Sequence, residues 1–199
     1  MKAISTEIIV AYAQCHRKAY LLYCTEEKGK LHEYTEIQYQ KREENRTKYI
    51  ASLRHQSPDL DYYSANDLKK GNNYLLNVKI ETEGLEAYAE LLTKVTTPSP
   101  LGKFSYEPTI FTGTYKITKE QEIELLYTGY ILAKIQKKMP INGSIVGADG
   151  VPRRIKLERG LKRLLPLLSS LHILSLYTAL LLYHHPSRFV VFTSSLSPL

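Results

Sequence analysis

Chemically reactive side chains gather near the start of the chain, in Cys15-His16-Arg17-Lys18. A thiol can bind metal or form a disulfide, and a His beside an Arg can contact a phosphate, although a solvated helix position is the more ordinary role of His16. Cys24 is the other cysteine, and two cysteines do not make a disulfide framework. The N-terminus lacks the full apolar core of a signal peptide. We therefore expect an intracellular, cytoplasmic domain.

The charge is positive and unevenly distributed. The 199 residues include 27 Lys and Arg against 20 Asp and Glu, a formal net charge of +7. Such a balance favours nucleic acid or an anionic membrane as a partner. All acidic residues lie at or before Glu158, whereas four basic residues follow from Arg159 onward. This shift predicts a boundary between a main domain, residues 1–158, and a tail, residues 159–199.

Three segments have the pattern of helices. Residues 6–23 repeat apolar side chains at helical spacing behind a possible cap at Ser5 or Thr6, with Cys15 to Lys18 inside the helix or at a break. Residues 33–53 carry mixed charges typical of a solvated face, and Ser57-Pro58-Asp59 ends that helix. A third helix starts after Thr118, with Gln121 at the capping-box position, and stops before Pro140.

Strand-like segments fill most of the remaining main domain. They are residues 74–81, 85–95, 104–115, 143–146 and 151–157, with Asp149-Gly150 as the turn between the last two. The predicted order is α-α-β-β-β-α-β-β. It indicates an α/β domain with a mixed sheet flanked by helices.

Several segments resemble the RecB-like nuclease family of the PD-(D/E)xK superfamily. The resemblance covers about residues 8–157, and the order β-β-β-α-β matches the restriction-endonuclease-like core. Its motifs are Cys15-His16-Arg17-Lys18-Ala19-Tyr20-Leu21, Leu101-Gly102-Lys103-Phe104-Ser105-Tyr106-Glu107-Pro108, Lys116-Ile117-Thr118-Lys119-Glu120-Gln121 and Gly129-Tyr130-Ile131-Leu132-Ala133-Lys134-Ile135-Gln136.

The resemblance implies a site for Mg²⁺ or Mn²⁺, ions that prefer carboxylate oxygens and lower the pKa of bound water. The family's strand aspartate falls on Glu90 and its second acid on Glu107, which makes both expected metal ligands and catalytic residues. The lysine of the family pattern would fall on Thr109, so Lys119 is the candidate for the position near the attacking water.

Each candidate also has a structural interpretation. Glu90 could be a polar residue on an exposed strand face, Glu107 an edge-strand charge, and Lys119 a surface lysine. Gln136, which resembles a helix glutamine of the family, is expected at a solvated helix end.

The family resemblance also raises an iron–sulfur site. Many relatives hold a [4Fe–4S] cluster with one N-terminal and three C-terminal cysteines, and such a cluster needs four thiolates. No cysteine follows Cys24 here, so this chain cannot supply a complete four-Cys site. We therefore expect Cys15 to be a buried thiol and Cys24 to be structural.

The tail has three interpretations. Residues 164–183 are uncharged and long enough to span a bilayer, with the basic residues before them placing the main domain in the cytoplasm. The abrupt change in composition is also typical of a frameshifted remnant, which resequencing the gene with its downstream DNA would test. The third interpretation is a helix that packs on the domain.

The sequence thus predicts metal-dependent hydrolysis of DNA phosphodiester bonds, weakened or absent in this chain. One alternative is a non-catalytic nucleic-acid-binding remnant, favoured by Glu90 and Thr109, where the chain departs from the family pattern. Another is a small membrane-anchored domain. No small-molecule cofactor is implied.

Overall fold

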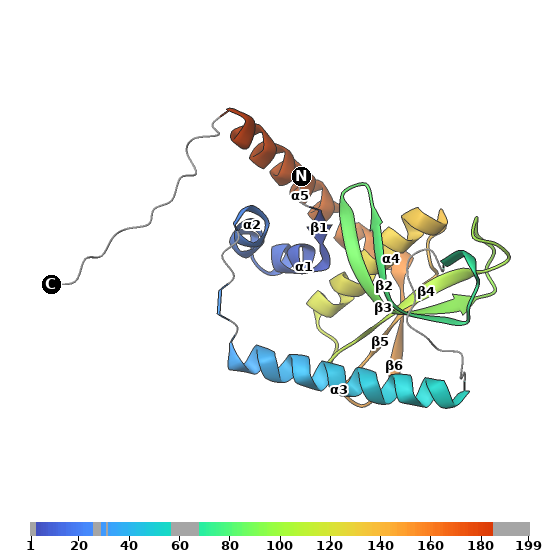
Figure 1. The fold of residues 1–199 in the computed structure, drawn as a ribbon. Coiled ribbons are helices and arrows are strands. Elements are labelled where there is room, and N and C mark those ends of the chain that lie inside the picture. Colours follow the sequence, from blue (N-terminus) through green and yellow to red (C-terminus); the bar gives the residue numbers. More distant parts are fainter. Residues whose placement is uncertain (1–2, 26–28, 31, 57–67, 185–199) are drawn as a thin grey trace.

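The computed structural model describes residues 3–25, 29–30, 32–56 and 68–184, without the side chains of residues 172 and 174–184. Its elements combine one mixed sheet with flanking helices, as the sequence predicts (Figure 1). In chain order they are β1 Ile4–Ser5, α1 Thr6–Gln14, α2 His16–Cys24, α3 Glu33–Gln56, β2 Tyr74–Thr82, β3 Leu85–Val95, β4 Ser105–Phe111, α4 Lys119–Gln136, β5 Asn142–Val146, β6 Pro152–Lys156 and α5 Leu157–His184.

The sheet has six strands, and β3 lies at its branching point. Strand β2 pairs along one edge of β3, while β1 and β4 share the other edge. Strands β3 and β4 are antiparallel, β4 and β5 are parallel, and β5 and β6 are antiparallel. The parallel pair needs a crossover, and α4 supplies it.

Local signals fix the helix boundaries. The Ser5 side chain caps α1 by accepting from the Ile8 N–H, and the extended backbone of Cys15 separates α1 from α2. The predicted first helix is therefore two helices with a break. The capping box predicted for α4 is confirmed, because Thr118 and Gln121 exchange both capping hydrogen bonds. The segment Ser57-Pro58-Asp59, expected to end α3, lies outside the described residues.

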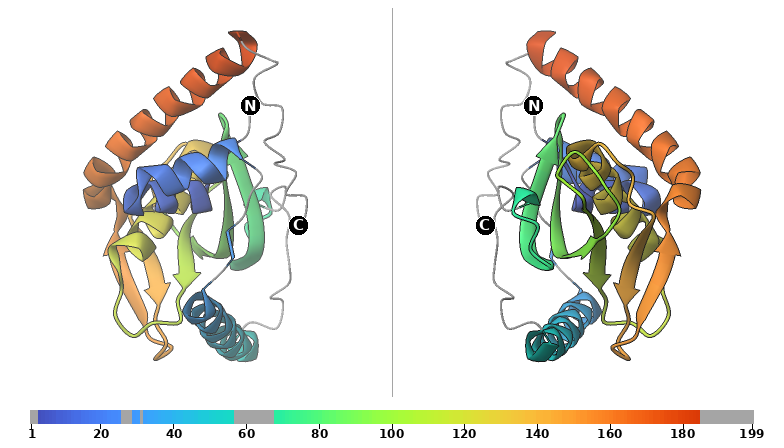
Figure 2. Two further views of the ribbon diagram at one scale, coloured as in Figure 1. Left: turned by 90° about the vertical axis from the view of Figure 1, so that its left-hand side faces the viewer. Right: turned by 90° about the vertical axis from the view of Figure 1, so that its right-hand side faces the viewer.

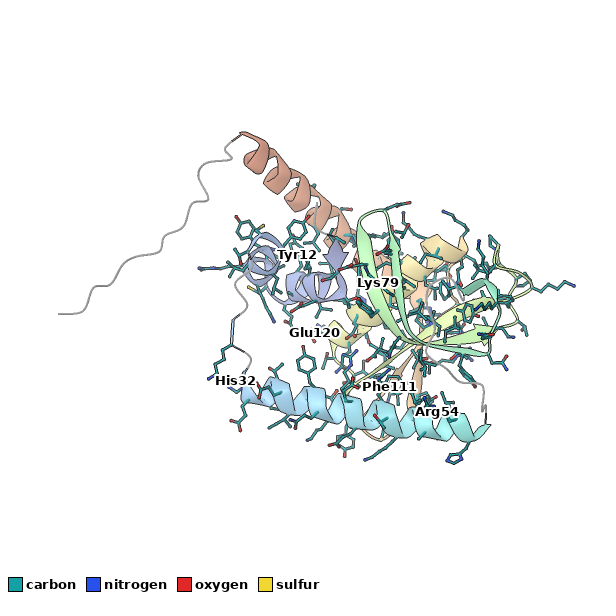
Figure 3. The ribbon with its side chains drawn as sticks, in the orientation of Figure 1. Tyr12, His32, Arg54, Lys79, Phe111 and Glu120 are labelled. Atoms are coloured by element: carbon teal, nitrogen blue, oxygen red, sulfur yellow. The ribbon has the colours of Figure 1, made fainter. Side chains whose placement is uncertain are left out.

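Two apolar clusters hold the layers together. The larger lies between the sheet and α1, α4 and α5, with Tyr127 and Leu132 among its fully buried side chains. The smaller holds Ile50 and Leu53 of α3 against Phe111 and neighbouring strand residues. Figures 1 and 2 show α3 crossing one end of the sheet, away from α1, α2 and α5. Phe111 points toward α3 (Figure 3), where its ring meets that of Tyr49 edge-on at 5.5 Å.

Helix α5 begins at Leu157, next to the predicted boundary at Glu158, and its first turns belong to the main core. Leu157, Leu164, Leu168 and Leu171 are all buried there. Gly160 permits this packing, because an added Cβ would overlap the side chain of Leu126. In the described part of the tail, α5 packs on the core through these leucines and continues through Pro166. Within the described residues, no helix is long and apolar enough to cross a membrane.

Candidate functional site

Glu90 lies where β3 and β4 separate. On the edge of β3 shared by β1 and β4, the ladders include Leu85 and Glu86 and then resume at Leu91, so residues 87–90 have no strand partner there in the described chain. Beyond the ladder, the backbone N–H of Phe111 donates to Oε2 of Glu90 at 2.8 Å. The carboxylate thus takes the place of the backbone acceptor that β3 no longer provides.

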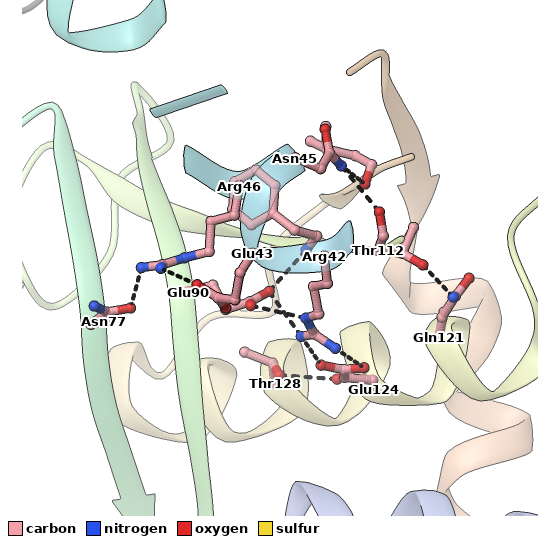
Figure 4. A network of polar contacts seen from close by, with 12 residues as sticks. Arg42, Glu43, Asn45, Arg46, Asn77, Glu90, Thr112, Gln121, Glu124 and Thr128 are labelled. Carbon is pink, nitrogen blue, oxygen red and sulfur yellow. Dashed lines mark hydrogen bonds and ion pairs between the residues drawn. The ribbon is translucent and has the colours of Figure 1, made fainter. Parts of the chain in front are cut away.

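Arg42 of α3 joins Glu90 to a second acid, Glu124 of α4 (Figure 4). Its Nε donates to Oε1 of Glu90 at 3.1 Å, and its Nη2 lies 3.0 Å from Oε2. The same guanidinium donates to the two oxygens of Glu124, at 2.6 and 3.4 Å. Two carboxylates from different elements therefore converge on one cation, in a site not expected from the sequence.

The electrostatics of this cluster are those of a partly buried ion triad. Side-chain exposure is 23% for Arg42, 15% for Glu90 and 19% for Glu124. Burial raises the pKa of Glu90 above its ordinary value, and the charge and hydrogen bond of Arg42 offset only part of that rise. Burial alone would lower the pKa of Arg42, but the two carboxylates more than compensate and raise it. The guanidinium is therefore charged at any physiological pH.

A second polar contact fastens α3 to the sheet beside Arg42. The buried amide of Asn45 approaches the carbonyls of Thr112, Val146 and Gly147, with Nδ2 at 3.1, 3.1 and 2.7 Å. These carbonyls lie where β4 and β5 end. Asn45 and Arg42 together attach α3 to the sheet near Glu90, where β3 and β4 separate.

Glu107 belongs to a different cluster. One of its oxygens accepts from the Asn142 backbone N–H and side-chain amide, at 3.0 and 3.1 Å, and the other pairs with Arg154 at 3.1 Å. The carboxylate is thus held by the start of β5 and the middle of β6.

The two predicted metal ligands are not brought together. The Phe111 N–H binds Glu90, and Phe111 pairs with Val146 in the β4–β5 ladder. The Asn142 N–H binds Glu107, and Asn142 lies four residues before Val146 on β5. Four strand residues correspond to roughly 13 Å. Each carboxylate lies 2.8 or 3.0 Å from the backbone nitrogen that holds it. The two carboxylates are thus held by partners far apart along β4 and β5, and in this arrangement they do not share one site for Mg²⁺. Catalytic roles for either acid remain predictions.

The other two expected positions, Thr109 and Lys119, make no side-chain hydrogen bond or ion pair with Glu90 or Glu107 in the described chain. Thr109, where the family lysine would fall, is buried between its strand neighbours Leu91 and Ser144. Lys119 is the exposed first residue of α4 and makes no ion pair with the described residues. Within the part of the chain that the structure describes, no group of three or more His, Cys, Asp or Glu could hold a metal.

Two structural expectations are wrong. Gln136 is fully buried, not solvated: it accepts from the Tyr106 N–H at 3.0 Å and donates to the carbonyls of Tyr106 and Lys138. Its side chain thereby satisfies backbone groups near the start of β4. Cys15 is exposed, not buried, because it lies at the break between α1 and α2. His16 is exposed as expected, with its ring stacked on Tyr12.

Comparison of the sequence with models of known protein families and with curated proteins gives no match. The site is therefore interpreted from its own geometry. That geometry consists of two carboxylates, Glu90 and Glu124, that share one arginine of the same chain.

Proposed function

We propose that this chain is a nucleic-acid-binding domain that does not hydrolyse its ligand. The observation that carries the proposal is the place of Arg42, whose guanidinium lies within hydrogen-bond distance of both Glu90 and Glu124. A divalent ion bound by these acids would need the oxygens that Arg42 occupies, and it would have to lie beside a fixed positive charge. Glu90, one of the two metal ligands that the family resemblance implies, already has Arg42 as its cation, which supports a domain without a metal.

Nucleic acid is the ligand for two reasons. The net charge of +7 favours a polyanion, and the sequence motifs resemble those of nucleases. The second argument is one of resemblance, since a fold by itself does not determine a function. Binding is expected to be independent of sequence and strongly weakened by salt, because phosphate contacts release counterions.

A paired binding and cleavage assay tests the proposal. The purified chain is titrated into labelled single-stranded and duplex DNA at 50 mM salt, and the same DNA is incubated with Mg²⁺ or Mn²⁺. We expect binding without metal-dependent cleavage, and no difference between the wild type and Glu107→Ala. Cleavage by the wild type that Glu107→Ala abolishes would refute the non-hydrolytic assignment.

The second candidate is metal-dependent DNA hydrolysis, favoured by the convergence of Glu90 and Glu124 on one cation. If α3 moves away with Arg42, the two acids could bind a divalent ion instead. Arg42→Ala would then gain Mn²⁺-dependent cleavage, and adding Glu124→Gln would remove it. Absence of cleavage in Arg42→Ala, under conditions where the variant is folded, would reject this candidate.

A further inference from the structure

Four basic side chains at one end of the sheet are exposed and make no hydrogen bond or ion pair with the described residues. They are Lys138 after α4, Lys156 at the end of β6, and Arg159 and Lys162 in the first turns of α5. We call these four residues the basic edge. Their charges are available to a ligand because no carboxylate in the described chain pairs with them.

Backbone contacts bring these residues close together where β6 is followed by α5. Lys156 is level with Asn142 in the β5–β6 ladder, and the Leu157 N–H donates to the Ile141 carbonyl at 3.2 Å. Lys138 precedes Ile141 by three residues, a span of at most about 10 Å. Lys162 follows Lys156 by six residues, about 9 Å of helix rise. The basic edge is therefore at most roughly 20 Å long.

Neighbouring arginines differ from the basic edge because each of them pairs with a carboxylate of the described chain. Arg154 binds Glu107, Arg163 binds Glu122 of α4 at 2.6 Å, and Arg153 binds Asp149 at 2.5 Å. Glu158 is the single acid within residues 150–163, and it is exposed without an ion pair in the described chain. The basic side chains of this region thus form two groups: arginines that pair with acids of the chain, and exposed residues that have no such partner.

We propose that the basic edge binds the phosphate backbone of nucleic acid. This inference rests on the proposed function and specifies the surface that performs it. A length of at most about 20 Å corresponds to at most about six nucleotides of one strand at 3.4 Å each, which is enough to place several phosphates against four cations. The cations come from a loop, a strand and a helix whose backbones are joined by the β5–β6 ladder and by the hydrogen bond between Leu157 and Ile141.

A charge-matched pair of variants tests the surface. The first variant changes the basic edge to glutamine at all four positions. The control changes four other exposed residues to glutamine. Their side chains make no hydrogen bond or ion pair with the described residues: Arg17, Lys48, Lys103 and Lys116. Both variants lose four positive charges, so overall charge does not distinguish them. Circular dichroism and thermal midpoints establish that both are folded.

Binding is measured by fluorescence anisotropy with labelled 20-base-pair DNA between 50 and 200 mM salt. Loss of four phosphate contacts is expected to flatten the slope of log K against log salt by about 3.6, because each contact contributes about 0.9. We expect the basic-edge variant to bind at least tenfold more weakly at 50 mM salt, and the control less than threefold.

The outcomes separate this inference from the proposed function. If the wild type binds DNA and both variants weaken equally, the basic edge is refuted while nucleic-acid binding stands. If the wild type does not bind nucleic acid, both proposals fail. Vesicles containing phosphatidylserine form a parallel arm, since an anionic membrane offers similar charge. Vesicle binding that depends on the basic edge, without DNA binding, would assign the surface to a membrane and overturn the inference.

Discussion

Replacing Arg42 by methionine would leave two partly buried carboxylates without their cation. Methionine preserves much of the apolar stem, so the change mainly removes charge and hydrogen bonds. Removing one partner of a buried ion pair typically costs 3–5 kcal/mol. Because the Arg42 side chain is 23% exposed, we take the lower end and expect the free energy of unfolding to fall by about 3 kcal/mol at pH 7.

The loss should depend on pH. The pKa of Glu90 is already raised above its ordinary value of 4.5, chiefly by burial, and loss of Arg42 raises it further. A carboxyl whose folded-state pKa is raised contributes stability that is fully present below pH 4.5 and is lost as the pH rises through the folded pKa. The difference between Arg42→Met and the wild type should therefore be smallest near pH 4 and increase toward pH 7.

Urea denaturation at pH 4, 5.5 and 7 measures this difference. Arg163→Met is the matched control, since Arg163 also binds one glutamate of α4 but is 53% exposed. Exposed pairs contribute about 0–1 kcal/mol, so the control should lose little stability at any pH. An Arg42→Met loss that is the same at all three pH values, or no larger than that of the control, would refute the account of the triad.

Four further substitutions test the packing and the cap of α4 by urea denaturation. Gln136→Leu should lose about 2–3 kcal/mol, because the backbone groups of Tyr106 lose their partner; a loss below about 0.5 kcal/mol would contradict that role. Leu164→Ala should lose about 3 kcal/mol and Leu165→Ala less than about 0.5 kcal/mol, since the first is buried and the second exposed. Equal losses would mean that α5 does not pack as described. Thr118→Ala should cost about 1 kcal/mol through loss of the capping box, and an unchanged midpoint would argue against it.

Elements with strong local signals were predictable from the sequence. The capping residues Thr118 and Gln121 mark the start of α4, and the turn at Asp149-Gly150 lies between β5 and β6. Gly150 has φ +71, a conformation that glycine adopts without strain. Strand β1 was missed because two residues carry no periodic pattern, and they enter the sheet only through pairing with Leu85 and Glu86.

The candidate site was less predictable because its contacts connect distant parts of the chain. Arg42 lies among several charges on α3, and nothing in the sequence distinguishes it from its solvated neighbours. Its partners are 48 and 82 residues away. Gln136 was misjudged for the same reason, since a glutamine at a helix end becomes buried only when β4 lies beside it.

The way α3 is attached predicts that this helix opens as a separate cooperative unit. Besides the small cluster around Ile50 and Leu53, the described contacts of α3 with the rest of the protein include hydrogen bonds from the side chains of Arg42, Asn45 and Arg46. The main core, in contrast, assembles from α1, α4, α5 and the sheet without α3. Amide protons of α3 should therefore exchange with solvent earlier than those of β3 and β4 and as a group, and this opening would uncover Glu90 and Glu124 while the sheet stays intact.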